Sequence, residues 1–194
     1  LAVYYKSETT LPYKADLCQE NGFILGSSTN DIAVENGLKF HIDWLKGQKT
    51  GFFVDQRDNR SLLEQYSKGR KVLNMFCYTG GFSVYSMRGG AELVHSVDSS
   101  SKAVELVNKN IALNFPGDTR HQAFAADAFK FLDEMASNYD LVILDPPAFA
   151  KNHKNLQQGL KGYKKINQKA IEKIKPGGLI FTFSCSQAVS KDDF

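Results

Sequence analysis

Residues 72–83, VLNMFCYTGGFS, decide the fold of this chain. The apolar run at 72–76 is typical of a buried strand, and residues 82–88 follow with the pattern of a short helix. Between them, Gly80 and Gly81 let the backbone turn sharply and approach a ligand closely. A strand, a tight glycine turn and a helix in this order predict the first unit of an α/β sheet. The glycine spacing is not GxGxxG, which argues against a dinucleotide site.

Strands and helices alternate along the rest of the chain. We expect further strands at 93–97, 122–125, 139–144 and 179–183, and helices at 101–113, 128–136 and 157–174. Another helix, ending at Gly69, precedes the first strand. In the helix at 157–174, the side chains expected to face inward are Ile166, Ala170, Ile171 and Ile174. Five strands joined by helical crossovers predict an α/β fold with a parallel, doubly wound sheet.

The stretch before residue 49 has a different pattern. Two short apolar runs at 32–34 and 38–42 flank Glu35-Asn36-Gly37, and Asn-Gly supplies the positive φ that a tight hairpin turn needs. We therefore expect a small β-rich N-terminal subdomain at 1–48 and the sheet domain at 49–194. The first residue is not Met and the chain stops soon after the fifth strand, so we expect a piece truncated at both ends.

Composition places the chain among globular proteins. Of its 194 residues, 42% are hydrophobic and 23% charged, which excludes disordered and collagen-like classes. Since no apolar stretch approaches the roughly 20 residues of a membrane helix, we expect no membrane partner. The three cysteines include no CxxC pair, which argues against a disulfide framework and a zinc site. These features predict a soluble, cytoplasmic protein.

The charge is unevenly distributed. Residues 151–175 contain eight lysines and one acid, so they carry +7, which leaves −4 for the rest of a chain with net charge +3. A basic segment on a slightly acidic body favours a local surface for a polyanion. The alternative interpretation is a solvated, lysine-rich helix face.

Acidic side chains stand at the ends of three predicted strands. Asp98, Asp127 and Asp145 end or follow the second, third and fourth strand. Ligands of open α/β sheets bind beyond the carboxyl ends of the strands, where an acid can accept hydrogen bonds from ribose hydroxyls or an adenine amino group. Each acid alone is as well explained as a helix cap. Their occurrence at successive strand ends, after the glycine turn, predicts a cofactor that contains a nucleoside.

Five strings give the chain its resemblance to a known family: GFFVDQRDNR (51–60), VLNMFCYTGGFSVYSMRGGA (72–91), LVILDPPAFAK (141–151), GYKKIN (162–167) and PGGLIFTFSCS (176–186). Together they resemble the ribosomal RNA large subunit methyltransferase I family, class I RNA cytosine-C5 methyltransferases, over residues 20–190. The resemblance implies a Rossmann-like class I methyltransferase fold, S-adenosyl-L-methionine as cofactor and large-subunit ribosomal RNA as partner. In that family a PUA domain precedes the β-rich region and further strands follow the last motif, so we expect this chain to be a piece without them. A homodimer is kept as a further expectation.

The resemblance implies covalent catalysis. Cys185 would add to C6 of the cytosine, and Asp145 would bind its N3/N4 edge. The alternative for Cys185 is a small buried hydrophobic residue. Many relatives carry another cysteine just after Asp-Pro, where this chain has Pro147 and Ala148, so the base that removes the C5 proton is unassigned. No metal is expected, because the sulfonium already activates the methyl group.

The resemblance also assigns the binding residues. Those expected around the cofactor are Gln56, Arg57, Phe76, Tyr78, Thr79, Gly80, Asp98, Ser99, Asp127, Ala128, Phe129 and Asp145. Those expected around the RNA are Pro146, Pro147, Phe149, Lys151, Lys154, Lys161, Tyr163 and Lys164, with Lys165 beside them. Phe149 would be free to stack on the target base, and Tyr163 on a flanking base. The alternative for Arg57 is a surface ion pair with Asp55 or Asp58.

Three other functions stay open at this point. Asp-Pro-Pro-aromatic motifs also serve methylation of a base nitrogen, which needs no cysteine. The chain is also compatible with a small-molecule methyltransferase, or with a catalytically silent RNA-binding subunit. Replacement of Cys185 by alanine separates carbon from nitrogen chemistry.

Overall fold

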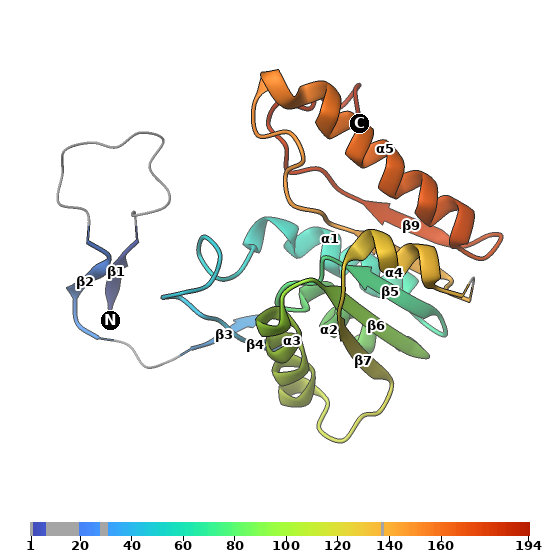
Figure 1. Cartoon of the computed structure of the whole chain (residues 1–194). Helices are drawn as coiled ribbons and strands as arrows, with labels where there is room; N and C mark the ends of the chain where they lie inside the picture. Colours follow the sequence, from blue (N-terminus) through green and yellow to red (C-terminus); the bar gives the residue numbers. More distant parts are fainter. Residues whose placement is uncertain (1, 7–19, 28–30, 137) are drawn as a thin grey trace.

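The computed structural model describes residues 2–6, 20–27, 31–136 and 138–194 (Figure 1). Its centre is a parallel sheet of five strands: β5 (Lys71–Met75), β6 (Leu93–Asp98), β7 (His121–Ala125), β8 (Leu141–Leu144) and β9 (Leu179–Thr182). Their order is β7-β6-β5-β8-β9, which confirms the predicted doubly wound sheet. After β5 the chain adds β6 and β7 on one side of that strand and then β8 and β9 on its other side. The strand order therefore reverses between β5 and β8, and such a switch point is where open α/β sheets bind ligands.

Strand β8 shows why these residues form the centre of the sheet. All four of its side chains are buried, and successive side chains point to opposite faces. Leu141 and Ile143 pack into one core, whereas Val142 and Leu144 pack into the other. A continuous run of β-branched and aliphatic residues is expected where both faces of a strand are covered.

Helices cover both faces of the sheet (Figure 1). The helices whose residues enter the first core are α1 (Arg57–Tyr66), α2 (Gly81–Arg88) and α3 (Ser101–Asn114). Those of the second core are α4 (Ala128–Glu134) and α5 (Leu156–Lys173). Two 3₁₀ turns, η1 (Val54–Gln56) and η2 (His153–Asn155), lead into α1 and α5. The observed helix ends lie within two residues of the predicted ones, except that α1 ends at Tyr66, three residues before Gly69.

The inward face of α5 differs from the prediction at one position. Ile166 and Ala170 are fully buried and Ile174 is partly buried, as expected. Ile171, however, is 65% exposed, so the prediction for it is wrong. One step along a helix rotates the side chain by about 100°, which carries residue 171 off the stripe that Ala170 occupies. The buried stripe continues instead to Tyr163.

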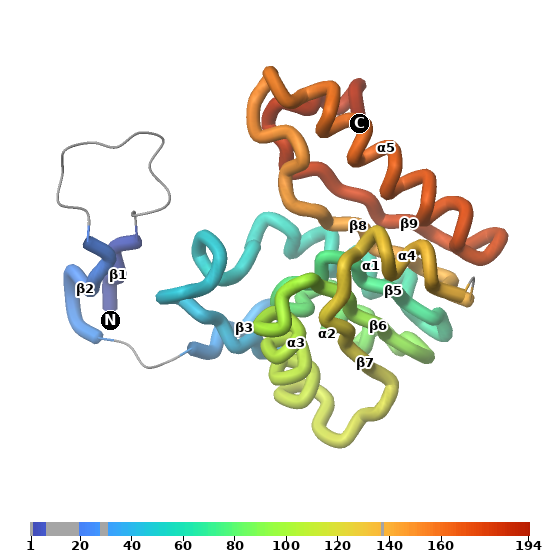
Figure 2. Tube along the Cα trace, in the orientation of Figure 1, coloured from blue at the N-terminus to red at the C-terminus, as the bar shows by residue number. Residues whose placement is uncertain are grey.

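The N-terminal part forms two antiparallel hairpins. Strands β1 (Val3–Tyr5) and β2 (Gly22–Leu25) pair with each other, and β3 (Ile32–Glu35) pairs with β4 (Leu38–His41). The predicted Asn36-Gly37 turn is confirmed, with positive φ at both residues. Figure 2 shows β4 beside α3, and alternate residues from 38 to 42 enter the first core. The division of the chain at residue 48 stays a prediction, and Cys18 lies outside the described residues.

A chain of buried polar groups crosses the first core beneath the turn after β5. Asn74 Nδ2 donates to Ser83 Oγ at 2.8 Å, and Ser83 Oγ lies 2.7 Å from Ser96 Oγ. Ser96 Oγ lies 2.8 Å from His121 Nε2. Burial, with the neighbouring His95, lowers the pKa of His121 to about 4, so the imidazole is neutral near pH 7. The chain therefore joins three neighbouring strands to α2 without a net charge.

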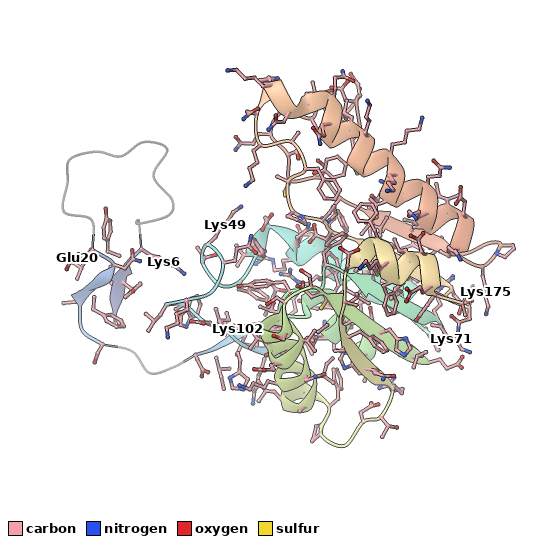
Figure 3. The ribbon with its side chains drawn as sticks, in the orientation of Figure 1. Lys6, Glu20, Lys49, Lys71, Lys102 and Lys175 are labelled. Carbon is pink, nitrogen blue, oxygen red and sulfur yellow. The ribbon has the colours of Figure 1, made fainter. Side chains whose placement is uncertain are left out.

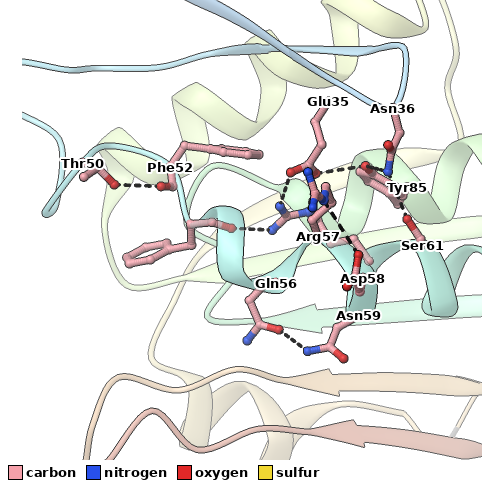
Figure 4. Close-up of polar contacts among 12 residues, drawn as sticks. Glu35, Asn36, Thr50, Phe52, Gln56, Arg57, Asp58, Asn59, Ser61 and Tyr85 are labelled. Carbon is pink, nitrogen blue, oxygen red and sulfur yellow. Dashed lines mark hydrogen bonds and ion pairs between the residues drawn. The ribbon is translucent and has the colours of Figure 1, made fainter.

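A buried ion pair joins the second hairpin to the helices (Figure 4). Arg60 on α1 is 3% exposed and binds Glu35 with two hydrogen bonds, Nε to Oε1 at 2.9 Å and Nη2 to Oε2 at 2.8 Å. The hydroxyl of Tyr85 on α2 donates to the same Oε1 at 2.9 Å, and Asn36 Nδ2 donates to that hydroxyl at 3.0 Å. Arg60 Nη1 also donates to the carbonyl of Phe53 at 3.0 Å. One guanidinium thus fixes three segments.

Replacing Glu35 by glutamine should lower the free energy of unfolding by about 3–5 kcal/mol, because it leaves the buried Arg60 charge without its counterion. Urea denaturation followed by circular dichroism measures the change. Glu92→Gln is the control, since the Lys71–Glu92 pair is exposed and should contribute at most about 1 kcal/mol. Equal losses in the two variants would contradict the structural role of the buried pair.

Among the helices of the described residues, none is long and apolar enough to cross a membrane.

Candidate active site

The carboxyl ends of the five strands bring the predicted site residues to one edge of the sheet. The loop 76–80 follows β5, Asp98 ends β6 and Asp145 follows β8. Met75 on β5 pairs with Leu144, and Leu144 with Thr182 on β9, so these three strands end at the same level. Loops from neighbouring strands therefore meet above the switch point.

The loop after β5 is tightly wound. Phe76 and Tyr78 adopt φ of 58° and 44°, in the left-handed region that costs a non-glycine residue about 1–3 kcal/mol. The conformation is held by hydrogen bonds from Cys77 N to Val97 O at 3.0 Å and from Gly80 N to Cys77 O at 2.7 Å. Gly80 is required, because its φ is 78° and an added Cβ would lie 2.0 Å from Val107 Cγ2. Strain of this kind is typical of functional loops.

Asp98 connects this loop to the start of α3. Its Oδ2 accepts from Tyr78 N at 3.0 Å, and its Oδ1 accepts from Ser100 N at 2.9 Å. Each oxygen retains a second lone pair, so the fixed carboxylate can still accept from two hydroxyls. Asp127 accepts from Lys130 N at 3.0 Å and caps α4, so the cap interpretation holds for this residue. A cap uses only part of its carboxylate.

Asp145 is partly buried at the end of β8. Gln56 Nε2 donates to its Oδ1 at 3.3 Å, while Gln56 Oε1 accepts from Asn59 (Figure 4). Burial raises the pKa of Asp145 to about 6, and the charge of Asp55 adds to the increase. Arg60 and the Gln56 hydrogen bond act in the opposite direction. A carboxyl group with this pKa can hold or release a proton near neutral pH.

Cys185 lies beside the segment that follows Asp145. Its Sγ is 3.7 Å from the carbonyl oxygen of Pro146, and the residue is exposed. Partial burial of the thiol raises its pKa, the charge of Asp145 raises it further, and the charge of Lys49 lowers it. Figure 3 shows Lys49 on the loop between β4 and η1. The site thus combines a thiol, a carboxyl group of raised pKa and a nearby cation.

Comparisons with known proteins assign this arrangement to a family. A family model described as S-adenosylmethionine-dependent methyltransferase matches residues 13–194. The chain belongs to this family. The crystal structure of SMU.776 complexed with SAH superimposes on this methyltransferase with a TM-score of 0.78 and 28% identity, covering 90% of the chain and 47% of that protein. The fold is thus Rossmann-like, as the resemblance implied.

Curated relatives are more similar in sequence. Ribosomal RNA large subunit methyltransferase I of Tolumonas auensis is 41% identical over 199 residues, which cover 100% of this chain and 50% of the relative. The protein of the same name from Shewanella denitrificans is 39% identical over 198 residues, with the same coverage. The methyltransferase chain described here spans about half the length of these relatives.

The strand-end residues of the methyltransferase fit S-adenosylmethionine, the cofactor of the family. The Asp98 carboxylate presents free lone pairs suited to ribose hydroxyls, and the strained loop 76–80 lies beside it. Phe129 is partly buried at the start of α4, and its contact with adenine stays a prediction. Thr79, Ala128 and Pro146 are buried, whereas Ser99 and Pro147 are exposed.

One aromatic residue contradicts its predicted role. Tyr163 is 3% exposed, and its hydroxyl is bonded to Ser186 Oγ, so its ring is not available to a flanking base and the prediction for it is wrong. The partly buried ring of Phe149 lies 4.7 Å from that of Tyr163 and 6.4 Å from that of Phe129, and its stacking on the target base stays a prediction. Arg57 lies 3.7 Å from Asp58 with an exposed side chain, as the ion-pair alternative predicted.

The structure divides the lysine-rich segment into two parts. Toward its C-terminal end, Lys169 binds Asp133, Lys173 binds the Asp133 carbonyl and Lys175 binds Asp140. Toward its N-terminal end, five lysines have no ion-pair partner among the described residues: Lys151, Lys154, Lys161, Lys164 and Lys165. A hollow of about 650 Å³ is lined by Lys154, Gln157, Gln158, Lys161, Gly162 and Lys165. The free positive charge is thus gathered at one end of α5.

Three contributors were not predicted from the sequence. The charge of Lys49 lowers the pKa of Cys185, and the charge of Arg60 lowers the pKa of Asp145. Ser186 forms a hydrogen bond with Tyr163. Only Ser186 had a local signal, since it adjoins Cys185 in the last motif. Lys49 and Arg60 reach the site through contacts that no spacing in the sequence indicates.

Replacing Asp145 by asparagine should stabilise the fold at pH 7.5. Because its pKa rises from 3.8 to about 6 on folding, the folded chain binds this proton more tightly, and stability falls as the pH rises through that interval. The neutral side chain removes a cost of up to about 3 kcal/mol. Urea denaturation at pH 7.5 and below pH 4 measures the gain, which should vanish in acid.

Asp140→Asn is the control, because it should change the free energy of unfolding in the opposite direction. The backbone N–H of Lys71, with Lys175, lowers the pKa of Asp140, so this variant should lose stability at pH 7.5. A gain for Asp145→Asn that is as large in acid as at pH 7.5 would contradict the burial of its charge.

Proposed function

We propose that this chain carries the catalytic part of an enzyme that transfers a methyl group from S-adenosylmethionine to C5 of a cytosine in large-subunit ribosomal RNA. The observation that carries the proposal is the position of Cys185 beside the segment that follows Asp145: its Sγ lies 3.7 Å from the carbonyl oxygen of Pro146, and the charge of Asp145 raises its pKa. The similarity to relatives named ribosomal RNA large subunit methyltransferase I supports the choice of substrate.

Cysteine chemistry is needed because C5 of an intact cytosine is not nucleophilic. The Cys185 thiolate adds to C6, so that an S–C6 bond forms and the electron pair moves through the ring to N3. Asp145 places a proton on N3, which turns the ring into an enamine with a nucleophilic C5. When bound, the cofactor would supply the methyl group: C5 would form the new bond to carbon as the S–CH3 bond breaks, and the electron pair of that bond would stay on the sulfur, which leaves as a neutral thioether.

The end of the reaction restores the enzyme. The C5 proton passes to water, the S–C6 bond breaks, and the electron pair of the C5–H bond re-forms the C5–C6 double bond. Cys185 leaves as thiolate and Asp145 takes back the N3 proton. The charge of Asp145 disfavours the Cys185 thiolate, so the thiolate forms more readily while Asp145 holds its proton. The charge of Lys49 favours the thiolate.

The lysines without acidic partners at the start of α5 support an RNA substrate. A target base must leave its stack to enter a site between loops, and the surrounding surface must then hold phosphates. Lys154, Lys161 and Lys165 line the hollow, and the ammonium of Lys165 is 5.4 Å from the Phe129 ring centroid. The homodimer and the cytoplasmic location stay predictions.

Replacing Cys185 by alanine should abolish methyl transfer to ribosomal RNA while cofactor binding is kept, because the alanine cannot add to C6. Transfer of a labelled methyl group to naked and assembled ribosomal RNA, with calorimetric titration of S-adenosylmethionine, measures both. Ser190→Ala is the control, since its exposed hydroxyl binds only Asp193. Retained turnover would instead indicate methylation of a base nitrogen. A wild-type protein inactive on either RNA would favour a small-molecule substrate or a silent subunit.

Replacing Lys154, Lys161 and Lys165 together by glutamine should weaken RNA binding and make the plot of log K against log [salt] shallower by about 2. Filter binding between low and high salt measures the slope. The matched triple variant of Lys169, Lys173 and Lys175 should change binding less, because acids or carbonyls already hold these ammonium groups. Equal effects of the two variants would contradict a specific surface.

A further inference from the structure

Two buried hydroxyl groups meet behind the candidate active site. Tyr163 on α5 and Ser186 after β9 are 3% and 5% exposed, and their oxygen atoms lie 2.7 Å apart. Neither group touches Asp145 or Cys185 directly in any recorded hydrogen bond of the described residues. Two hydroxyls removed from water need partners, and theirs come from the loop that carries the Asp-Pro-Pro motif.

The pair binds the backbone of that loop at two successive residues. Ala150 N donates to Ser186 Oγ at 3.2 Å, and Phe149 N donates to Tyr163 Oη at 3.4 Å. The segment after β8 is thereby tied to the segment after β9. Since Ser186 directly follows Cys185, and Asp145 begins the other segment, the tie fixes the thiol relative to the carboxyl group.

Helix α5 is built to receive this loop. A Cβ on Gly159 would lie 2.6 Å from Ala150 Cβ and 2.9 Å from Ala150 N, and one on Gly162 would lie 3.0 Å from Phe149 Cδ2. Glycine within a helix costs about 1 kcal/mol relative to alanine. Two such residues within one turn are explained by the close approach of the loop. The tie is therefore a property of helix, loop and strand end together.

We propose that Tyr163 and Ser186 are positioning residues that hold Cys185 and Asp145 in register for attack on the target base. The inference rests on the proposed function, since it assumes that both groups act on one base. Cys185 Sγ lies 3.7 Å from Pro146 O in the tied arrangement, within the segment that the two hydroxyls restrain. A displacement of about 1 Å between reacting groups can reduce a rate about 100-fold.

The test compares Tyr163→Phe, Ser186→Ala and Ser186→Thr with the wild type, all made in the full-length protein. Tyr139→Phe is the matched control, because Tyr139 is also buried, at 5%, and its hydroxyl binds His95 Nδ1 at 2.6 Å at the opposite end of β8. Methyl transfer gives kcat and KM. The pH dependence of Cys185 alkylation by iodoacetamide, followed on its own peptide by mass spectrometry, reports the surroundings of the thiol without requiring any turnover.

Tyr163→Phe and Ser186→Ala should lower kcat at least about tenfold with the KM for S-adenosylmethionine nearly unchanged. They should also lower the pKa seen in alkylation, because burial and the Asp145 charge raise the pKa of Cys185, and both weaken when the loops separate. Lys49, the other charged group acting on the thiol, lowers its pKa and is untouched. Ser186→Thr, which keeps the hydroxyl, should restore kcat relative to alanine.

Two results would overturn the proposal. Either Tyr163→Phe and Ser186→Ala behave like Tyr139→Phe in both measurements, or kcat falls in proportion to a general loss of folded protein while the alkylation profile is unchanged. Failure of the proposed function has a different signature. In that case Cys185→Ala retains turnover, while the alkylation profile still shows whether the two hydroxyls hold the thiol. Ser186→Ala keeps the test valid if the tyrosine variant does not fold.

Discussion

The buried ion pair between Arg60 and Glu35 is the contact on which the arrangement of the site depends. It joins a hairpin, two helices and the carbonyl of Phe53. Glu35 lies 25 residues before Arg60 and 50 residues before Tyr85 in the sequence. Gln56, which donates to Asp145, lies one helical turn before Arg60. Because a buried guanidinium must keep all these acceptors, the start of α1 cannot shift without exposing or abandoning a charge. The position of Gln56 beside Asp145 thus depends on the Arg60–Glu35 ion pair, which lies outside the site.

The site itself is maintained at the expense of stability. Asp145 is held where its ionised form is disfavoured, and Phe76 and Tyr78 adopt backbone angles that other residues avoid. Neither feature improves the fold, since a neutral side chain and relaxed angles would both be more favourable. The surrounding structure compensates with two continuous cores on the faces of the sheet. Features that cost stability are therefore gathered at the carboxyl edge.

The sheet could be predicted from the sequence because its central strands β5 and β8 are buried on both faces and the Gly80-Gly81 turn follows β5. The position of Asp98 and Asp145 followed from topology alone, since parallel strands end at one edge. The burial of Tyr163 could also have been predicted, because it precedes Ile166 and Ala170 at helical spacing and so lies on the same buried face of α5. An aromatic side chain among lysines is also typical of an RNA-binding surface, which led to the wrong prediction. The contributions of Lys49 and Arg60 depend on tertiary contacts that local patterns do not encode.

The polar chain from Asn74 to His121 has a direction. The amide nitrogen of Asn74 gives its hydrogen to Ser83, which leaves Ser83 its own hydrogen to give. All the hydroxyl hydrogens of the chain find an acceptor within it when Ser83 donates to Ser96 and Ser96 donates to Nε2 of a His121 that carries its hydrogen at Nδ1. With the other tautomer, in which Nε2 donates to Ser96 and Ser96 to Ser83, the Ser83 hydrogen has no acceptor among these four groups. The tautomer of a histidine on β7 is thus coupled to hydrogen bonds that begin two strands away.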